Sequence, residues 1–165
     1  MNNLKLSLRS AAAFRPYILI DGEEQKLKKN QFSSYDVFYQ TEKEEVTVEI
    51  FKPHELNGVL WLLMAFIFNI VSLFGLLDPW YDGKCFNFSV KFTVKLKEST
   101  NVNLYFPNFI DGNKAVQFTT ESQLTEVENV CFLDKKLQKR VKTVRAIKII
   151  SWVLLIGAII CLFVI

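Results

Sequence analysis

The chain has 165 residues and a formal net charge of +3, with half of its residues hydrophobic and 22% charged. The small charge excess argues against a nucleic-acid-binding protein. So much apolar sequence beside so much charge indicates segregated apolar and polar stretches, as in a small membrane protein. One histidine and three cysteines without metal-type spacing exclude a histidine metal cluster, and no metal or cofactor is expected.

The first predicted region, residues 1–57, is β-rich. Leucines alternate with polar residues over positions 4–9, a period that favours a half-buried strand over a cleavable targeting peptide. A short strand is predicted at residues 17–20, and a further strand at residues 46–50 from the alternation of apolar and polar residues.

Two stretches of this region resemble the small PEGA-type β modules of bacterial envelope proteins. They are the hairpin start ILIDG at residues 18–22 and the strand VTVEI at residues 46–50. The resemblance covers residues 17–51. Independently of it, the Asp21-Gly22 pair is a turn signal that closes the strand at residues 17–20. The chain lacks that module's glycines before the closing strand, and the resemblance implies no functional residue.

The first apolar segment, Gly58–Leu77, has twenty residues without a charge. A helix of that length measures about 30 Å, the thickness of the hydrocarbon core of a bilayer. Its polar exceptions are Asn69 and Ser72, which are candidates for helix packing. Asn69 either bonds a partner helix or is satisfied locally by its own helix.

A second β-rich region is predicted at residues 78–133. Residues 86–97 alternate six times between apolar and polar, which indicates an antiparallel strand with one face on a core. The alternation resumes at residues 102–106, and weaker strands are expected around 116–118 and at 127–133.

From residue 134 the period becomes helical, and a basic amphipathic stalk is predicted over residues 134–148. Apolar residues recur at three- and four-residue steps, and Asp134 is a suitable N-cap. The remaining faces hold seven cations, a basic collar that can contact anionic lipid headgroups. The collar comprises Lys135, Lys136, Lys139, Arg140, Lys142, Arg145 and Lys148.

The stalk leads into seventeen uncharged residues, 149–165, which are predicted to be a C-terminal transmembrane anchor. Stalk and anchor together predict one helix of about 31 residues. Gly157 and Cys161 form a small-xxx-small pair, a second candidate for helix packing.

The collar predicts the orientation of the chain, because positive charge beside a span favours the cytoplasmic side. Residues 78–148 are therefore expected in the cytoplasm, at the plasma or inner membrane. Two topologies remain for Gly58–Leu77. If it crosses, residues 1–57 lie outside; if it enters and returns, both β regions share the cytoplasmic face.

Residues that carry chemistry are sparse. The only histidine, His54, lies beside the first apolar segment, where an interfacial polar residue is the expected role. Cys85 and Cys131 are expected as thiols rather than a disulfide, and Cys161 as a packing residue of the anchor. No catalytic or metal-binding motif is present, and an enzyme is not expected.

The predicted fold is a membrane-anchored α+β protein. Short antiparallel β-strands form a small sandwich-like domain. The chain also has two apolar helical segments, the second continuous with a basic stalk helix. The expected function is a non-enzymatic interaction or accessory protein with the lipid bilayer and an unknown protein as partners. The alternative is a small oligomeric membrane subunit, a channel or transport accessory, that acts through its helices.

Overall fold

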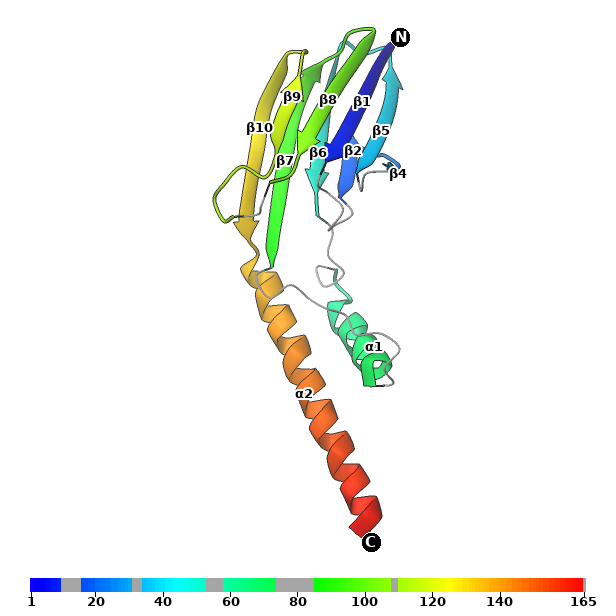
Figure 1. Ribbon diagram of the computed structural model, residues 1–165, viewed down its shortest axis with the longest axis vertical. Coiled ribbons are helices and arrows are strands. Elements are labelled where there is room, and N and C mark those ends of the chain that lie inside the picture. The colour runs from blue at the N-terminus through cyan, green and yellow to red at the C-terminus, as the bar shows by residue number, and fades with distance from the viewer. Residues whose placement is uncertain (10–15, 31–33, 53–57, 74–84, 108–109, 165) are drawn as a thin grey trace. The chain divides into compact units, whose positions relative to one another are not determined.

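The structure, a computed structural model, describes residues 1–9, 16–30, 34–52, 58–73, 85–107 and 110–164. The described residues form an α+β protein with two β-sheets and two helices (Figure 1). Two compact units divide the chain. The β unit comprises Met1–Pro53 and Phe86–Leu133, and the helical unit comprises His54–Cys85 and Asp134–Ile165.

Each sheet of the β unit has five described strands. The first sheet, here sheet A, has the order β4-β5-β1-β8-β9, and sheet B has the order β10-β7-β6-β2-β3. The strands are β1 (Asn2–Arg9), β2 (Tyr17–Ile20), β3 (Glu23–Glu24), β4 (Lys28–Lys29), β5 (Tyr35–Thr41), β6 (Glu45–Phe51), β7 (Phe86–Lys95), β8 (Ser99–Tyr105), β9 (Gln117–Thr120) and β10 (Leu124–Leu133).

Both sheets combine strands from the two predicted β regions, which meet at one strand pair in each sheet. In sheet A, β1 pairs with β8, and in sheet B, β6 pairs with β7. The β1–β8 pair is parallel, whereas the other described pairings are antiparallel, so the expectation of antiparallel strands is wrong for this pair. No hairpin joins β1 to β8, and their long connection leaves a parallel pairing open.

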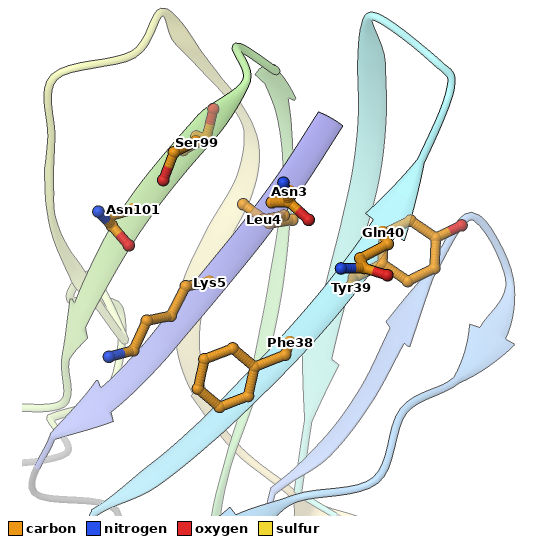
Figure 2. A pocket seen from close by; sticks show the side chains of 9 residues that line it. Asn3, Leu4, Lys5, Phe38, Tyr39, Gln40, Ser99 and Asn101 are labelled. Atoms are coloured by element: carbon orange, nitrogen blue, oxygen red, sulfur yellow. The ribbon is translucent and has the colours of Figure 1, made fainter. Parts of the chain in front are cut away.

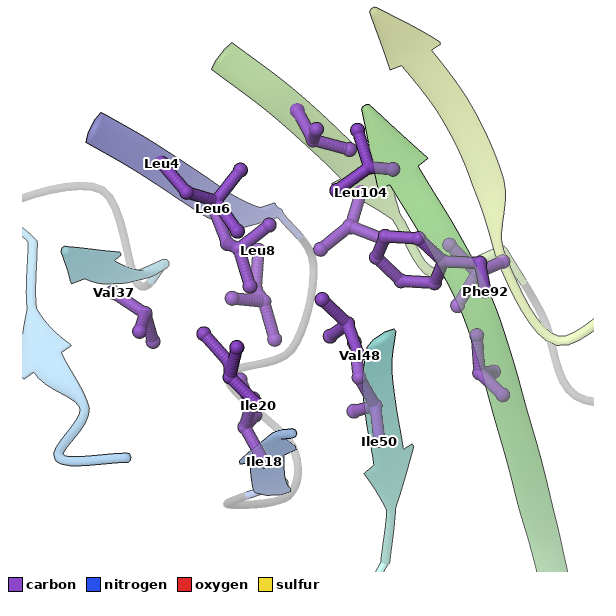
Figure 3. Close-up of a cluster of buried hydrophobic side chains, with 14 of the residues drawn as sticks. Leu4, Leu6, Leu8, Ile18, Ile20, Val37, Val48, Ile50, Phe92 and Leu104 are labelled. Atoms are coloured by element: carbon purple, nitrogen blue, oxygen red, sulfur yellow. The ribbon is translucent and has the colours of Figure 1, made fainter. Parts of the chain in front are cut away.

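The two sheets face each other across one apolar core (Figure 3). Leu4, Leu6 and Leu8 of β1 are each 1% exposed or less, which confirms the alternating pattern predicted for residues 4–9. They belong to the same buried cluster as Ile18 and Ile50 of sheet B. The architecture is therefore a small sandwich, held by side chains from both β regions.

Strand β7 supplies the largest residues of this core. The face predicted from residues 86–97 is confirmed, because Phe88, Val90 and Phe92 are each 2% exposed or less. The ring of Phe92 lies edge-on to the ring of Phe118 of sheet A, with centroids 4.9 Å apart. This contact joins the two sheets with the geometry that aromatic pairs prefer.

The predicted turn at Asp21-Gly22 is confirmed. Ile20 pairs with Glu23, which leaves these two residues as the hairpin loop. Both have positive φ, 51° and 84°, as a two-residue type I′ turn requires. An aspartate followed by a glycine is a favoured sequence for such a loop, so this local signal was sufficient.

Strand β5 was not predicted, because its apolar and polar residues do not alternate regularly. Val37 is buried in the core, but the neighbouring Phe38 is 55% exposed on the opposite face. An outward aromatic residue beside an inward valine leaves no clear apolar–polar alternation. The two-residue strands β3 and β4 were also missed, since so short a segment carries no period.

In the helical unit, α2 (Lys135–Val164) is one continuous helix of 30 residues. This confirms the predicted continuity of the stalk with the apolar run. The helix begins as expected, because the Asp134 carboxylate accepts a hydrogen bond of 2.9 Å from the backbone N–H of Leu137. Helix α1 (Trp61–Leu73) covers the first part of Gly58–Leu77, and residues 74–77 lie outside the described chain.

Candidate functional site

The outer face of sheet A carries many polar side chains, which come from three adjacent strands (Figure 2). Its centre is β1, where Lys5 lies between Phe38 of β5 and Asn101 of β8 in the strand register. The outward residues of these three strands are here called the β1 face. They are Asn3, Lys5, Ser7 and Arg9 of β1, Asp36, Phe38 and Gln40 of β5, and Ser99, Asn101, Asn103 and Tyr105 of β8.

Two open depressions cover the β1 face. One has a volume of about 590 Å³ and is lined by amide, hydroxyl and aromatic side chains, including Asn3, Gln40 and Ser99. The other has a volume of about 330 Å³ and shares Lys5 and Asn101 with the first. The shared residues make the two depressions continuous across the middle of the sheet.

The backbone of this face is already satisfied. Strand β1 pairs with β5 on one side and β8 on the other, and β8 also pairs with β9. The sheet-forming N–H and C=O groups of both central strands therefore point to neighbouring strands. Any molecule bound to the β1 face must use side-chain amides, hydroxyls and cations.

Two lysines, Lys5 on the β1 face and Lys28 of the neighbouring strand β4, contact the same aromatic ring. The ammonium groups of Lys5 and Lys28 each lie 5.5 Å from the centroid of the Phe38 ring. Among the described residues, no carboxylate lies within ion-pair distance of Lys5, Lys28 or Arg9. The carboxylate of Asp36 instead accepts a hydrogen bond of 3.1 Å from the side-chain amide of Asn30.

Sheet B differs in this respect. Lys91 lies opposite Glu49 in the register, with 2.7 Å between the ammonium nitrogen and a carboxylate oxygen. Glu128 lies opposite the same lysine on its other side. The outer face of sheet B thus has Lys91 in an ion pair. The β1 face holds two cations, Lys5 and Arg9, and one carboxylate, Asp36, and no ion pair joins them among the described residues. Its charge excess is positive and suits an anionic partner.

The β1 face was not identified from the sequence, because three separate segments of the chain build it. A weak signal existed in the alternating polar residues of β1 and in Asn101 and Asn103 of β8. Each segment alone indicates only a solvated strand face. Their union depends on the β1–β8 pairing, which has no local signature.

The free edge of β10 is largely closed by the segment that precedes β9, residues 112–116. The side-chain amide of Asn129 accepts hydrogen bonds from the backbone N–H groups of Ala115 and Val116, and it donates one to the Val116 carbonyl. Further along, β10 has a bulge between Glu126 and Glu128. Loops, bulges and acidic residues protect an edge strand from pairing with another chain, so this edge is a poor binding site.

The predicted basic collar lies on the first half of α2. Five of its cations are exposed, and Arg140 and Lys148 are half-buried. The guanidinium carbon of Arg140 lies 5.0 Å from the ring centroid of Trp61 in α1. Lipid binding by the collar stays a prediction.

Helix α1 packs against this same half of α2. Leu137, Val141 and Val144 are buried in a cluster with Ala65 and Cys85, and Trp61 packs at its margin. The apolar positions that predicted the amphipathic stalk are therefore the positions that contact α1.

Among the helix-packing candidates, Asn69 is 5% exposed and donates a hydrogen bond of 2.8 Å to the Ala65 carbonyl. A hydrogen bond within its own helix is one of the two roles expected for Asn69. The side chain of Ser72 lies outside the described structure. A Cβ on Gly157 would meet no atom within 4 Å, and Cys161 is exposed, so the described part of the chain places no neighbour on Gly157. Their role in packing stays a prediction.

None of the three cysteines is in a disulfide. Burial raises the pKa of the Cys131 thiol, and the nearby Asp111 carboxylate raises it further. A buried, protonated thiol is a poor nucleophile. His54 lies outside the described residues, and within those residues no group of three metal-ligating side chains forms.

By length and composition, one described helix could cross a membrane, namely α2 over Lys135–Leu162. The apolar part of α1, Trp61–Val71, is shorter. No protein-family model, curated protein or solved structure matches this chain. The PEGA-type resemblance of residues 17–51 therefore rests on the quoted residues alone.

Proposed function

We propose that this chain is a non-enzymatic interaction protein, anchored in the plasma or inner membrane by α2, that presents its β unit at the cytoplasmic face. The observation that carries the proposal is the pairing of β1 with β8 and of β6 with β7. All strands of one sheet must lie on the same side of a membrane, since unpaired strands and loops are not tolerated in lipid. Residues before and after the 54–85 segment therefore belong on the same side.

The apolar run of α2 supports the anchor. Ile149, Leu154 and Leu162 are 64%, 68% and 81% exposed, and their neighbours are similarly uncovered. So long an exposed apolar helix is unfavourable in water and favourable in lipid. The basic collar immediately before it supports a cytoplasmic β unit, because lysine and arginine near a span are retained on that side.

Cysteine labelling tests this topology. Glu42→Cys and Asn113→Cys introduce exposed thiols from the two β regions into a chain whose own cysteines are replaced by alanine. A membrane-impermeant maleimide is expected to label both from the cytoplasmic side only. The chain without cysteines is the control, and labelling from opposite sides contradicts the proposal.

The β1 face is the proposed contact surface for a protein partner with acidic side chains. Support comes from Lys5, Lys28 and Arg9, which have no ion-pair partner among the described residues, and from the side-chain amides around them. Complementary charge of this kind favours specificity and fast association.

Site-specific photo-crosslinking in intact membranes tests this contact. A photoreactive residue at Asn101 is expected to give one discrete adduct, whereas the same residue at Lys91 on the outer face of sheet B gives none. Lys5→Gln with Arg9→Gln should abolish the adduct. The matched control, Lys95→Gln with Lys97→Gln, removes the same charge outside the β1 face and should leave the adduct intact. An adduct insensitive to both pairs contradicts the assignment.

A further inference from the structure

Helix α1 presents a broad apolar surface that nothing in the described chain covers. Its inner side packs through Ala65 and Trp61 against α2. Its outer side is exposed and carries large apolar side chains, namely Leu62, Leu63, Phe66, Ile67 and Ile70. Such a patch marks a contact with lipid or with another protein.

The contact between the two helices lies in the basic half of α2. The α2 residues that face α1 end at Val144, and the uncharged run begins at Ile149. The two positions are five residues apart along the helix, which is about 8 Å. The headgroup layer on each side of a bilayer is roughly 5–8 Å thick. If the uncharged run fills the hydrocarbon core, Val144 lies at headgroup depth, and it is the residue of this contact nearest the run. Leu137 and Val141 lie farther out.

A full crossing also fits the fold poorly. The strands before and after the 54–85 segment pair with each other in both sheets, so a single crossing by this segment would separate paired strands.

The geometry points to α1 as a membrane-surface helix that docks its outer apolar side into the leaflet where α2 enters, while α2 covers its inner side. This inference rests on the proposed anchoring by α2. The collar cations around the contact are complementary to anionic headgroups, and five of them are exposed. The Trp61 ring beside Arg140 is suited to this depth, since aromatic rings concentrate at the membrane interface. A leaflet in contact with the outer side of α1 would thus be continuous with the lipid around the apolar run of α2.

Depth-dependent quenching tests this placement. The full chain, with its three cysteines replaced by alanine, carries one environment-sensitive dye at Phe66→Cys and is reconstituted in vesicles of phosphatidylcholine and phosphatidylglycerol. A second α1 site, Ile70→Cys, guards against a local effect of one label. Matched controls are Ile156→Cys in the apolar run and Thr143→Cys on the exposed side of the collar.

We expect lipids brominated near the headgroup to quench both α1 labels more strongly than lipids brominated near the chain ends. The Ile156 label should show the opposite order, and aqueous iodide should quench the Thr143 label. An α1 label quenched like Ile156 means a deep or crossing segment and overturns the inference. Quenching by iodide alone, or by no reagent, means contact with water or with protein and also overturns it.

These outcomes separate the two proposals. If lipid quenches neither the Ile156 label nor the α1 labels, the anchor itself fails. If lipid quenches the Ile156 label and not the α1 labels, the anchor stands and the surface helix fails.

Discussion

Asp134 is the residue at which the helical unit resumes after the β unit, and its carboxylate caps α2. It accepts a hydrogen bond from the Leu137 backbone N–H, and the Gln138 N–H bonds the Asp134 carbonyl. No acidic residue follows in the first turn of α2, which is entirely basic at its exposed positions. The N-cap therefore stabilises a helix end whose positive charges repel the helix dipole.

Replacing Asp134 with alanine should destabilise the start of α2 by about 1 kcal/mol, the usual effect of losing an N-cap. Hydrogen exchange of the Leu137 amide measures this directly, and its protection should fall. Asp134→Asn retains an acceptor at the cap and should preserve most of the protection. Equal loss in both variants would mean that the charge, and not the cap, stabilises the helix.

Asp21 links the first hairpin to the rest of sheet B. Partial burial raises the pKa of its carboxyl, but hydrogen bonds from the Lys43 ammonium at 2.6 Å and the Thr47 backbone N–H at 2.9 Å lower it. The net result is a pKa below the usual value for aspartate. Ionised Asp21 is therefore favoured by the folded state.

The sign of the pH dependence follows from this lowered pKa. The stabilisation is fully present above the unfolded pKa of about 4, and it is lost as the pH falls through the lower folded value. Asp21→Asn keeps a residue that tolerates positive φ and removes only the charge. Urea unfolding of the full chain in detergent should show the wild type more stable near neutrality, with a difference that shrinks below about pH 4. A difference independent of pH would contradict this role.

At the scale of elements, the two halves of α2 have different surroundings. Its first half is partly covered by α1, and its second half has no neighbour within the described chain at Gly157. The alternative function, an oligomeric membrane subunit, would use this open small-residue site. The local hydrogen bond of Asn69 removes one polar group that such an assembly could use.

Gly157→Leu should therefore leave the oligomeric state of the full chain unchanged in membranes, as measured by chemical crosslinking. Leucine is also a better helix former than glycine by up to about 1 kcal/mol, so the helix itself should not weaken. Ala158→Leu adds a similar side chain at the adjacent position and is the control. Loss of a crosslinked species in Gly157→Leu alone would favour the oligomeric alternative.

At the scale of the whole molecule, the β unit is assembled from chain segments on both sides of the 54–85 insertion. Leu6 of β1 and Leu104 of β8 are both 0% exposed and belong to one core. An interruption by a helical segment is compatible with this sandwich because the β strands before and after it return to adjacent positions in both sheets.

Leu6→Ala and Leu104→Ala should each destabilise the same cooperative unfolding transition by about 2–5 kcal/mol, the usual range for a buried leucine. Limited proteolysis of the full chain in detergent should then cleave both β regions together in either variant. Val127→Ala, at the exposed bulge of β10, is the control and should have little effect. Selective cleavage of only the region that carries the mutation would contradict a shared core.

The sequence by itself determined those elements whose signal is local. The strands β1, β6, β7 and β8 follow from period-two alternation, the Asp21-Gly22 turn from its residue types, and α2 from its helical period and N-cap. Each of these depends on residues a few positions apart, which is why one segment at a time was enough to predict them.

Only the tertiary structure decided how these elements combine. The pairings of β1 with β8 and of β6 with β7 unite the two β regions, and the first of them builds the β1 face. The contact of α1 with the basic half of α2 is equally non-local. Backbone hydrogen bonds are chemically the same in every strand, and apolar faces accept many partners, so neither pairing has a signature in its own segment.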